Sequence, residues 1–201
     1  GFPIRFPNAS GWIGNVPAVA DLDLDGKLEI VCAFFEYDVG SIYVFRANGE
    51  AYSGTGGTGS PGNPVGEVFR YPNTFGTPVV ADITGDRHPE IIVRGGYILP
   101  GTGPERLIIL DYLGALLPGY PIVTPAPPSV VFSNSYATLI DDIDGDSLVE
   151  LALLGDAGQI YVWDHDASSR GGKNVGRVMA DNKNSSIFVD PNIPTDVPSD
   201  R

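Results

Sequence analysis

Three short stretches of the chain place acidic residues at alternating positions between runs that are typical of β-strands. The first is DLDLDGKLE at residues 21–29, and the others are DITGDRHPE at 82–90 and DIDGDSLVE at 142–150. Each stretch begins with Asp and ends with Glu at its ninth position. Like charges at this density repel one another, so either a cation neutralises them or they form solvated acidic turns.

The alternation suits a hard cation such as Ca²⁺, which takes about 6–8 oxygen ligands from carboxylates and backbone carbonyls in a tight loop. In the first stretch, the side chains of Asp21, Asp23 and Asp25 occupy positions one, three and five, so they can converge on one point. The carbonyl of Lys27 is the candidate ligand at position seven, and Glu29 closes the shell.

Two other structures can begin with acidic residues at this spacing. An EF-hand requires a bidentate Glu at position twelve and a helix on each side. Position twelve is Cys32, Val93 or Leu153, and the flanking segments resemble strands, so the EF-hand is excluded in all three copies. An acidic turn without metal remains the alternative, because Asp and Gly are favoured in turns for local hydrogen bonding alone.

Composition limits the classes of partner. A net charge of −13 argues against nucleic acids and anionic membranes, because binding to phosphate requires basic patches. No apolar run approaches the roughly 20 residues that span a bilayer, so we expect no membrane insertion. The single cysteine, Cys32, excludes an intrachain disulfide, and its apolar neighbours predict a small buried side chain.

The acidic stretches recur with a period of about 60 residues, and short strand-like segments follow each of them. These segments are rich in Val, Ile and Tyr and are separated by Gly, Pro and Asn, with no convincing amphipathic helix. The sequence therefore predicts an all-β fold of β-propeller-type blades, each with four antiparallel strands. About three repeats are too few for a closed ring of roughly 4–8 blades, so we expect a partial or open propeller.

The repeat sets the expected domain boundaries. The N-terminal GFPIR resembles GYPIV at 119–123, which indicates the last strand of a preceding or shared blade. The expected units are a terminal strand at 1–10, blade repeats at 11–72, 73–130 and 131–189, and a tail or linker at 190–201.

The repeated motif resembles the FG-GAP (VCBS-like, integrin α-type) β-propeller repeat family. The resemblance rests on FGTPVVADITGDRHPEIIV at 75–93, VPAVADLDLDGKLEIV at 16–31 and YATLIDDIDGDSLVELA at 136–152, and it covers roughly residues 10 to 166. It implies an extracellular or periplasmic propeller, stabilised by two to three Ca²⁺ ions and used for binding.

The resemblance also implies a ligand set for each loop. The first set is Asp21, Asp23, Asp25, the Lys27 carbonyl and Glu29; the second is Asp82, Thr84, Asp86, the His88 carbonyl and Glu90; the third is Asp142, Asp144, Asp146, the Leu148 carbonyl and Glu150. Thr84 replaces a carboxylate, so we expect weaker binding at the second loop. Family loops often end in Asp, and the longer Glu can ligate through a different oxygen or through a water molecule.

Candidate catalytic residues are scarce. The side chain of His88 should point away from the metal, and His165 lies between Asp164 and Asp166, which face the opposite side of a strand. We therefore expect no enzymatic activity. The aromatic residues Tyr43, Phe45, Tyr161 and Trp163 alternate along their strands, which favours packing between blades over a sugar-stacking surface.

The expected function is a non-catalytic, calcium-stabilised interaction module in extracellular adhesion, a scaffold or a surface assembly. Its partner would be a protein or further copies of the chain that complete the propeller, or a glycan. The alternatives are a propeller fragment of a secreted polysaccharide lyase or peptidase, and a carbohydrate-binding module. Asn8 and Asn184 begin N-x-S/T triplets that could carry glycans.

Overall fold

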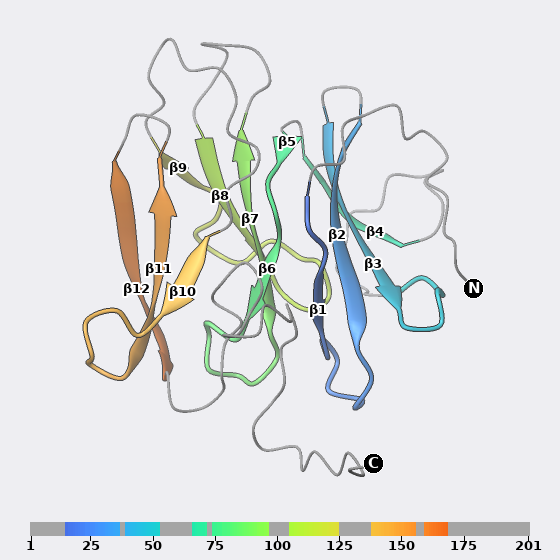
Figure 1. Ribbon diagram of the computed structural model, residues 1–201, viewed down its shortest axis with the longest axis horizontal. Coiled ribbons are helices and arrows are strands. Elements are labelled where there is room, and N and C mark those ends of the chain that lie inside the picture. Colours follow the sequence, from blue (N-terminus) through green and yellow to red (C-terminus); the bar gives the residue numbers. More distant parts are fainter. Residues whose placement is uncertain are drawn as a thin grey trace, which may run out of the picture.

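A computed structural model describes residues 15–36, 39–52, 66–71, 74–96, 105–124, 138–155 and 159–168. The predicted terminal strand at 1–10, the tail at 190–201 and both N-x-S/T asparagines lie outside these residues. All regular elements in the described residues are β-strands, in three antiparallel sheets that lie side by side (Figure 1). The predicted all-β fold of antiparallel blades is confirmed, and the described strands do not form a closed ring.

The first sheet has the predicted four strands, in the order of the chain. They are β1 (Ala18–Ala20), β2 (Glu29–Glu36), β3 (Val39–Arg46) and β4 (Glu67–Tyr71). After β3, the Asn48-Gly49 turn reverses the chain: Gly49 has φ of 84° and donates its N–H to the carbonyl of Arg46 at 2.8 Å. Glycine adopts this left-handed conformation at little steric cost, so the sequence places the turn here.

The second sheet has five strands. They are β5 (Thr74–Phe75), β6 (Val79–Ala81), β7 (Glu90–Gly96), β8 (Glu105–Leu110) and β9 (Ile122–Thr124). Both β5 and β6 pair with β7, β5 at its C-terminal end and β6 at its N-terminal end. They take the place of one predicted strand, which is interrupted where Pro78, lacking an N–H, cannot donate a ladder hydrogen bond.

The third sheet has three strands in the described part of the chain. They are β10 (Leu139–Asp141), β11 (Leu148–Leu154) and β12 (Ile160–Ser168). The residue before each acidic loop pairs with the Glu that ends it: Ala20 with Glu29, Ala81 with Glu90, and Asp141 with Glu150. The three sheets therefore share one register, and positions in one sheet can be matched to positions in the others.

Two apolar cores hold the sheets together. Alternate residues of a strand point to opposite faces, so each sheet has a front face, turned towards the next sheet in the chain, and a back face on the other side. The front face of the first sheet packs on the back face of the second, and the fully buried residues of this core include Leu22, Val44, Ile91 and Ile108. Each such side chain contributes roughly 1.5–3 kcal/mol when it is removed from water.

The front face of the second sheet packs in the same way on the back face of the third. This core includes Ile83, Ile92 and Ile109 from the second sheet and Leu151 from the third, with Trp163 packed against it. The inference that Trp163 serves packing between blades is thus supported by its contacts.

The back face of the first sheet carries a separate buried cluster. It consists of Phe34, Tyr43 and Phe45, with the rings of Tyr43 and Phe45 stacked at 6.3 Å between centroids. Cys32 packs against this cluster and is half-buried, and burial raises the pKa of its thiol to about 11.

Within the described residues there is no helix with the length and hydropathy needed to span a bilayer.

Candidate metal centres

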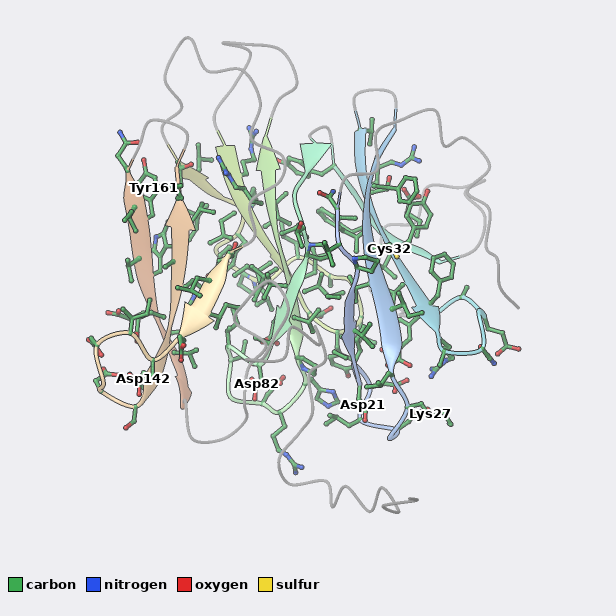
Figure 2. All side chains as sticks on the ribbon, viewed as in Figure 1. Asp21, Lys27, Cys32, Asp82, Asp142 and Tyr161 are labelled. Atoms are coloured by element: carbon green, nitrogen blue, oxygen red, sulfur yellow. The ribbon has the colours of Figure 1, made fainter. Side chains whose placement is uncertain are left out.

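The three acidic loops lie at the same end of the three sheets. Each connects the strands before and after it as a hairpin: β1 to β2, β6 to β7, and β10 to β11. Figure 2 shows Asp21, Asp82 and Asp142 in a row along one edge of the molecule. The repeat in the sequence is therefore a repeat in space.

The loops share one backbone conformation, with positive φ at positions four and six. The φ values are 59° and 82° at Leu24 and Gly26, 79° and 79° at Gly85 and Arg87, and 84° and 77° at Gly145 and Ser147. Only one of the two positions is glycine in each copy. The other residue has a Cβ atom, so the left-handed conformation is sterically unfavourable for it. The surrounding loop has to hold it in that conformation.

The Asp at position one organises each loop by accepting backbone hydrogen bonds. The two carboxylate oxygens of Asp21 accept the N–H groups of Asp25 at 3.0 Å and Gly26 at 2.9 Å. The carboxylates of Asp82 and Asp142 likewise accept N–H groups from their own loops. These bonds occupy part of the oxygen surface that was predicted to bind a cation.

The Asp at position five accepts the N–H of position seven in every copy. The N···O distances are 2.8 Å from Lys27 to Asp25, 2.8 Å from His88 to Asp86 and 2.7 Å from Leu148 to Asp146. The ammonium of Lys27 also lies 3.1 Å from Asp25, and this contact lowers the pKa of Asp25.

The Glu at position nine spans the loop and accepts the N–H of position two. Glu29 accepts from Leu22 at 3.0 Å and Glu90 from Ile83 at 2.8 Å, and Glu150 accepts from Ile143 in the same way. All three glutamates are buried. Burial raises the pKa of Glu29 to about 7 and that of Glu90 to about 8, because a charged carboxylate is costly away from water.

Two of the loops bring three carboxylates together. Oxygen atoms of Asp21, Asp23 and Glu29 lie within 4.8 Å of one another, and so do oxygen atoms of Asp142, Asp144 and Asp146. In the described part of the chain, no comparable trio forms at the second loop. There Thr84 stands at position three, and its hydroxyl donates to Glu90 at 3.3 Å.

A buried oxygen supports a cation in the first loop. Oδ1 of Asp23 is buried and has no hydrogen-bond partner. An unsatisfied carboxylate oxygen beside two other carboxylates is costly, and a hard cation would satisfy it. The donor set of this loop therefore fits Ca²⁺.

Arg46 is the functional residue that sequence reasoning missed at this site. Its Nη2 lies 2.8 Å from Asp23, and its Nη1 lies 3.4 Å from both Asp25 and Glu29. The guanidinium also lies over the ring of Tyr52, 5.3 Å from the centroid. Arg46 pairs with Glu29 across β2 and β3, so a correct hairpin register would have placed it beside the loop.

The second loop contacts the first through His88. The imidazole stacks on Tyr112 with 4.1 Å between ring centroids, and its Nδ1 lies 3.4 Å from the carbonyl oxygen of Leu22. This side chain joins neighbouring blades at the loop end of the molecule. The predicted metal ligand at loop position seven is the backbone carbonyl of His88, and these contacts involve only its side chain.

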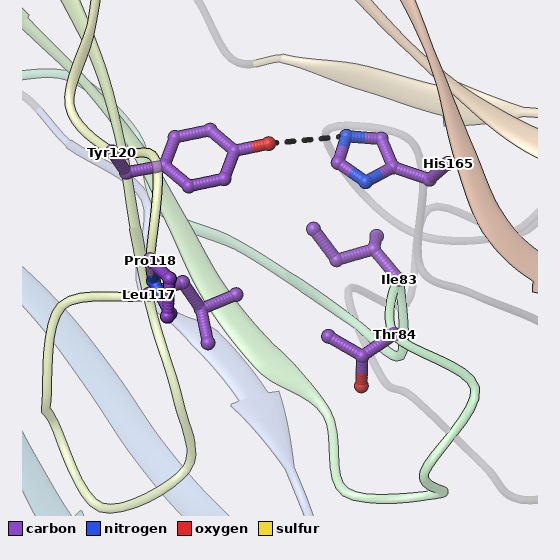
Figure 3. Close-up of a pocket in the computed structure, with 6 residues that line it drawn as sticks. All are labelled: Ile83, Thr84, Leu117, Pro118, Tyr120 and His165. Carbon is purple, nitrogen blue, oxygen red and sulfur yellow. Dashed lines mark hydrogen bonds between the residues drawn. The ribbon is translucent and has the colours of Figure 1, made fainter.

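A pocket lies beside the second loop, between the second and third sheets (Figure 3). Its lining consists of Ile83, Thr84, Leu117, Pro118, Tyr120 and His165. The Tyr120 hydroxyl and Nε2 of His165 are 3.3 Å apart, and burial raises the pKa of Tyr120. Among these six described lining residues there is no carboxylate and no thiol, and the polar side chains are Thr84 and the hydrogen-bonded pair of Tyr120 and His165.

Comparison with protein families matches residues 21–93 to the FG-GAP-like repeat. The matched segment contains the first two acidic loops. Searches of curated proteins and of solved structures give no match.

Proposed function

Because residues 21–93 match the FG-GAP-like repeat, we propose that this chain is a non-catalytic interaction module of β-propeller type, stabilised by calcium. It would act outside the cell or in the periplasm, in adhesion, in a scaffold or in a surface assembly. The observation that carries the calcium proposal is the buried, unpartnered oxygen of Asp23 beside Asp21 and Glu29.

The residues that would hold the ion differ between the loops. In the first loop, Asp21, Asp23 and Glu29 already converge, with Asp25 and the Lys27 carbonyl as the further predicted ligands. In the third loop, the converging residues are Asp142, Asp144 and Asp146, and the second loop has the weaker donor set. Bound Ca²⁺ would supply charge neutralisation and a cross-link between the strands on either side of the loop.

The proposed location outside the cytoplasm is supported by the affinity expected of such a loop. Calcium sites in extracellular modules commonly have dissociation constants of about 10⁻⁴–10⁻³ M. Sites of that strength are filled where calcium is millimolar and are mostly empty inside cells.

Two features support binding over catalysis. The loop carboxylates hold the backbone through hydrogen bonds, and none of the six residues that line the pocket at Tyr120 and His165 is a carboxylate or a cysteine. Three of the four aromatic residues that could have formed a sugar platform are engaged elsewhere: Tyr43 and Phe45 are buried, and Trp163 packs in the second core. A protein partner is therefore favoured over a glycan.

The test is calcium titration of chelator-treated protein, by calorimetry and native mass spectrometry. We expect two to three Ca²⁺ ions per chain and a rise of several degrees in the unfolding temperature, because an ion that binds only the folded state stabilises it. Asp23→Asn and Asp144→Asn should each remove one ion, whereas Glu50→Gln, at an exposed residue of the β3 turn, should remove none. Absence of binding at millimolar calcium would contradict the proposal.

A further inference from the structure

The side chain of His88 reaches from the second acidic loop to the backbone of the first. Its Nδ1 lies 3.4 Å from the carbonyl oxygen of Leu22, 66 positions away in the sequence. A carbonyl oxygen can only accept a hydrogen bond, so Nδ1 is the nitrogen that donates in this contact. The imidazole stacks on Tyr112 with 18° between the ring planes, which restrains the direction in which Nδ1 points.

The residue that receives this hydrogen bond stands between two carboxylates of the first loop. Leu22 separates Asp21 from Asp23, and both of these converge with Glu29. The N–H of Leu22 donates to Glu29 at 3.0 Å, and its side chain is fully buried in the first core. The contact with His88 holds the remaining polar group of Leu22, its carbonyl. This last restraint comes from the second sheet and its loop, not from the first loop itself.

The restraint is passed to Asp23 through the planar peptide unit. The carbonyl of Leu22 lies in one plane with the N and Cα atoms of Asp23, so holding the carbonyl limits the rotation of the whole unit. Asp23 carries the buried, unpartnered Oδ1 that supports a cation at this loop. His88 therefore acts on a predicted ligand without occupying its oxygens, whereas Arg46 contacts a carboxylate oxygen of Asp23 directly.

The hydrogen bond from His88 is not part of the repeated motif. His88 stands at position seven of the second loop, and position seven of the third loop is Leu148. A leucine side chain carries no hydrogen-bond donor, so Leu148 cannot make the same bond to the second loop. At the third loop, Ile143 is the counterpart of Leu22 and is 49% exposed. The first and third loops thus have similar carboxylates but differ in how firmly position two is held.

We propose that His88 is a positioning residue for calcium in the first loop. By holding the Leu22 carbonyl, it reduces the freedom of the segment from Asp21 to Asp23 before the ion binds, so less ordering is required on binding. The calcium affinity of the first loop then depends on a side chain from the second. This inference rests on the proposed function as a calcium-stabilised module, and it assigns a role to a side chain outside the predicted ligand sets.

Two substitutions separate the hydrogen bond from the ring stacking. His88→Phe keeps a ring for Tyr112 to stack on and removes the donor. His88→Asn removes the ring and keeps a donor, because Nδ2 of Asn and Nδ1 of His are the same number of bonds from Cα. Both variants retain the backbone carbonyl of residue 88, which is the predicted ligand in the second loop.

The loop glycines report on each site separately. Gly26, Gly85 and Gly145 each donate an N–H to the Asp at position one of their own loop, at 2.9, 2.7 and 2.8 Å. Their amide resonances are followed by NMR while calcium is added to the isotope-labelled, chelator-treated full chain. The midpoint of each shift gives the calcium affinity of one loop, and the third loop is the internal control.

We expect His88→Phe to raise the calcium concentration at the midpoint for Gly26 about two- to tenfold, as for the loss of one hydrogen bond. The midpoint for Gly145 should not change, because His88 contacts the first loop and not the third. In His88→Asn the midpoint for Gly26 should stay closer to that of the wild-type chain than in His88→Phe, since the donor is retained.

Several results would overturn the proposal. One is an unchanged Gly26 midpoint in His88→Phe, and another is a change confined to Gly85, which would place the effect within the second loop. An equal change at all three glycines would indicate a general loss of packing, and equal weakening in His88→Asn and His88→Phe would assign the effect to the ring. If no glycine of the wild-type chain shifts at millimolar calcium, the proposed calcium binding fails too, and the wild-type titration alone shows this.

Discussion

Arg46 changes how the first acidic loop is neutralised. Its guanidinium contacts Asp23, Asp25 and Glu29, and the ring of Tyr52 lies beneath it. An internal cation and a bound Ca²⁺ compete for the same oxygens. At the position that pairs with the Glu of the loop, the first loop has Arg46 and the third loop has Asp164. The two loops therefore differ in whether a cationic side chain stands at this position.

Replacing Arg46 should therefore have opposite effects with and without calcium. We expect Arg46→Gln to lower the free energy of unfolding of chelated protein by about 1 kcal/mol, because three carboxylates lose their cation. The same variant should tighten calcium binding at the first loop several-fold in calorimetry. Arg106→Gln, at the start of β8, removes the same charge away from the loops and should leave the calcium affinity of the first loop unchanged. Unchanged calcium affinity would show that Arg46 does not compete with the ion.

The buried glutamates predict a pH dependence of stability in chelated protein. The pKa values of Glu29 and Glu90 rise from 4.5 in the unfolded chain to about 7 and about 8 in the folded one. A raised pKa contributes stability below pH 4.5, and this contribution is lost as pH rises through 7 and 8. At about 1.4 kcal/mol per pKa unit, the loss is of order 3 kcal/mol for Glu29 and 5 kcal/mol for Glu90.

Urea unfolding in EDTA between pH 5 and 8.5 measures this loss. Glu90→Gln can still accept the N–H of Ile83 but does not titrate, so it should flatten the curve. Calcium should flatten it as well, because the ion favours the charged carboxylates. Stability that rises with pH over this window in EDTA would contradict the assignment.

At the scale of the loop element, the backbone conformation is common to all copies but the position of glycine is not. Leu24 has φ of 59° at position four of the first loop, where the second and third loops have glycine. At position six the glycine is in the first loop, as Gly26, and the other two loops have Arg87 and Ser147. The strain in each loop therefore sits at a different, identifiable residue.

Exchanging these residues should change stability in opposite directions. Leu24→Gly relieves the left-handed strain and should raise the free energy of unfolding by up to about 1 kcal/mol. Gly26→Ala should lower it by about 1 kcal/mol, and the cost is conformational because no atom lies within 4 Å of the added Cβ. Thermal unfolding with and without calcium measures both changes. A destabilising Leu24→Gly would mean that the leucine side chain contributes more than the strain costs.

At the scale of the whole molecule, the first and second sheets are each stabilised by the sheet that follows them in the chain. Leu22 and Ile143 occupy the same loop position, and within the described strands and loops only Leu22 has a neighbouring blade against it. Substitutions at Leu22 and Ile143 therefore separate the contribution of the loop to stability from the contribution of packing between blades.

Alanine at the two positions should therefore differ in cost. Leu22→Ala should lower the free energy of unfolding by about 2–5 kcal/mol because it leaves a cavity in the first core. Ile143→Ala should cost well under 1 kcal/mol in the isolated chain, since nearly half of this side chain is exposed. Denaturant unfolding of both variants measures the difference. Equal costs would show that both side chains act within their own loops.

Much of the architecture could be predicted from the sequence because it is local. Strand alternation, Gly and Asn at turns and the spacing of Asp21, Asp82 and Asp142 identify antiparallel hairpins closed by acidic loops. The loop hydrogen bonds also join residues at most seven positions apart, as from Leu22 to Glu29. Short-range geometry of this kind repeats whenever the motif repeats.

Tertiary structure decided what the motif cannot encode. The contact of Arg46 with Asp23 spans 23 residues and depends on the register of β2 and β3. One expected strand is split into β5 and β6, which lie on either side of Pro78 in the sequence. The split depends on tertiary structure because both short strands pair with β7. The same aliphatic pattern is buried at Val44 and exposed at Val162, because burial is set by whether another sheet lies against the face. That last difference comes from packing between blades, which no single repeat contains.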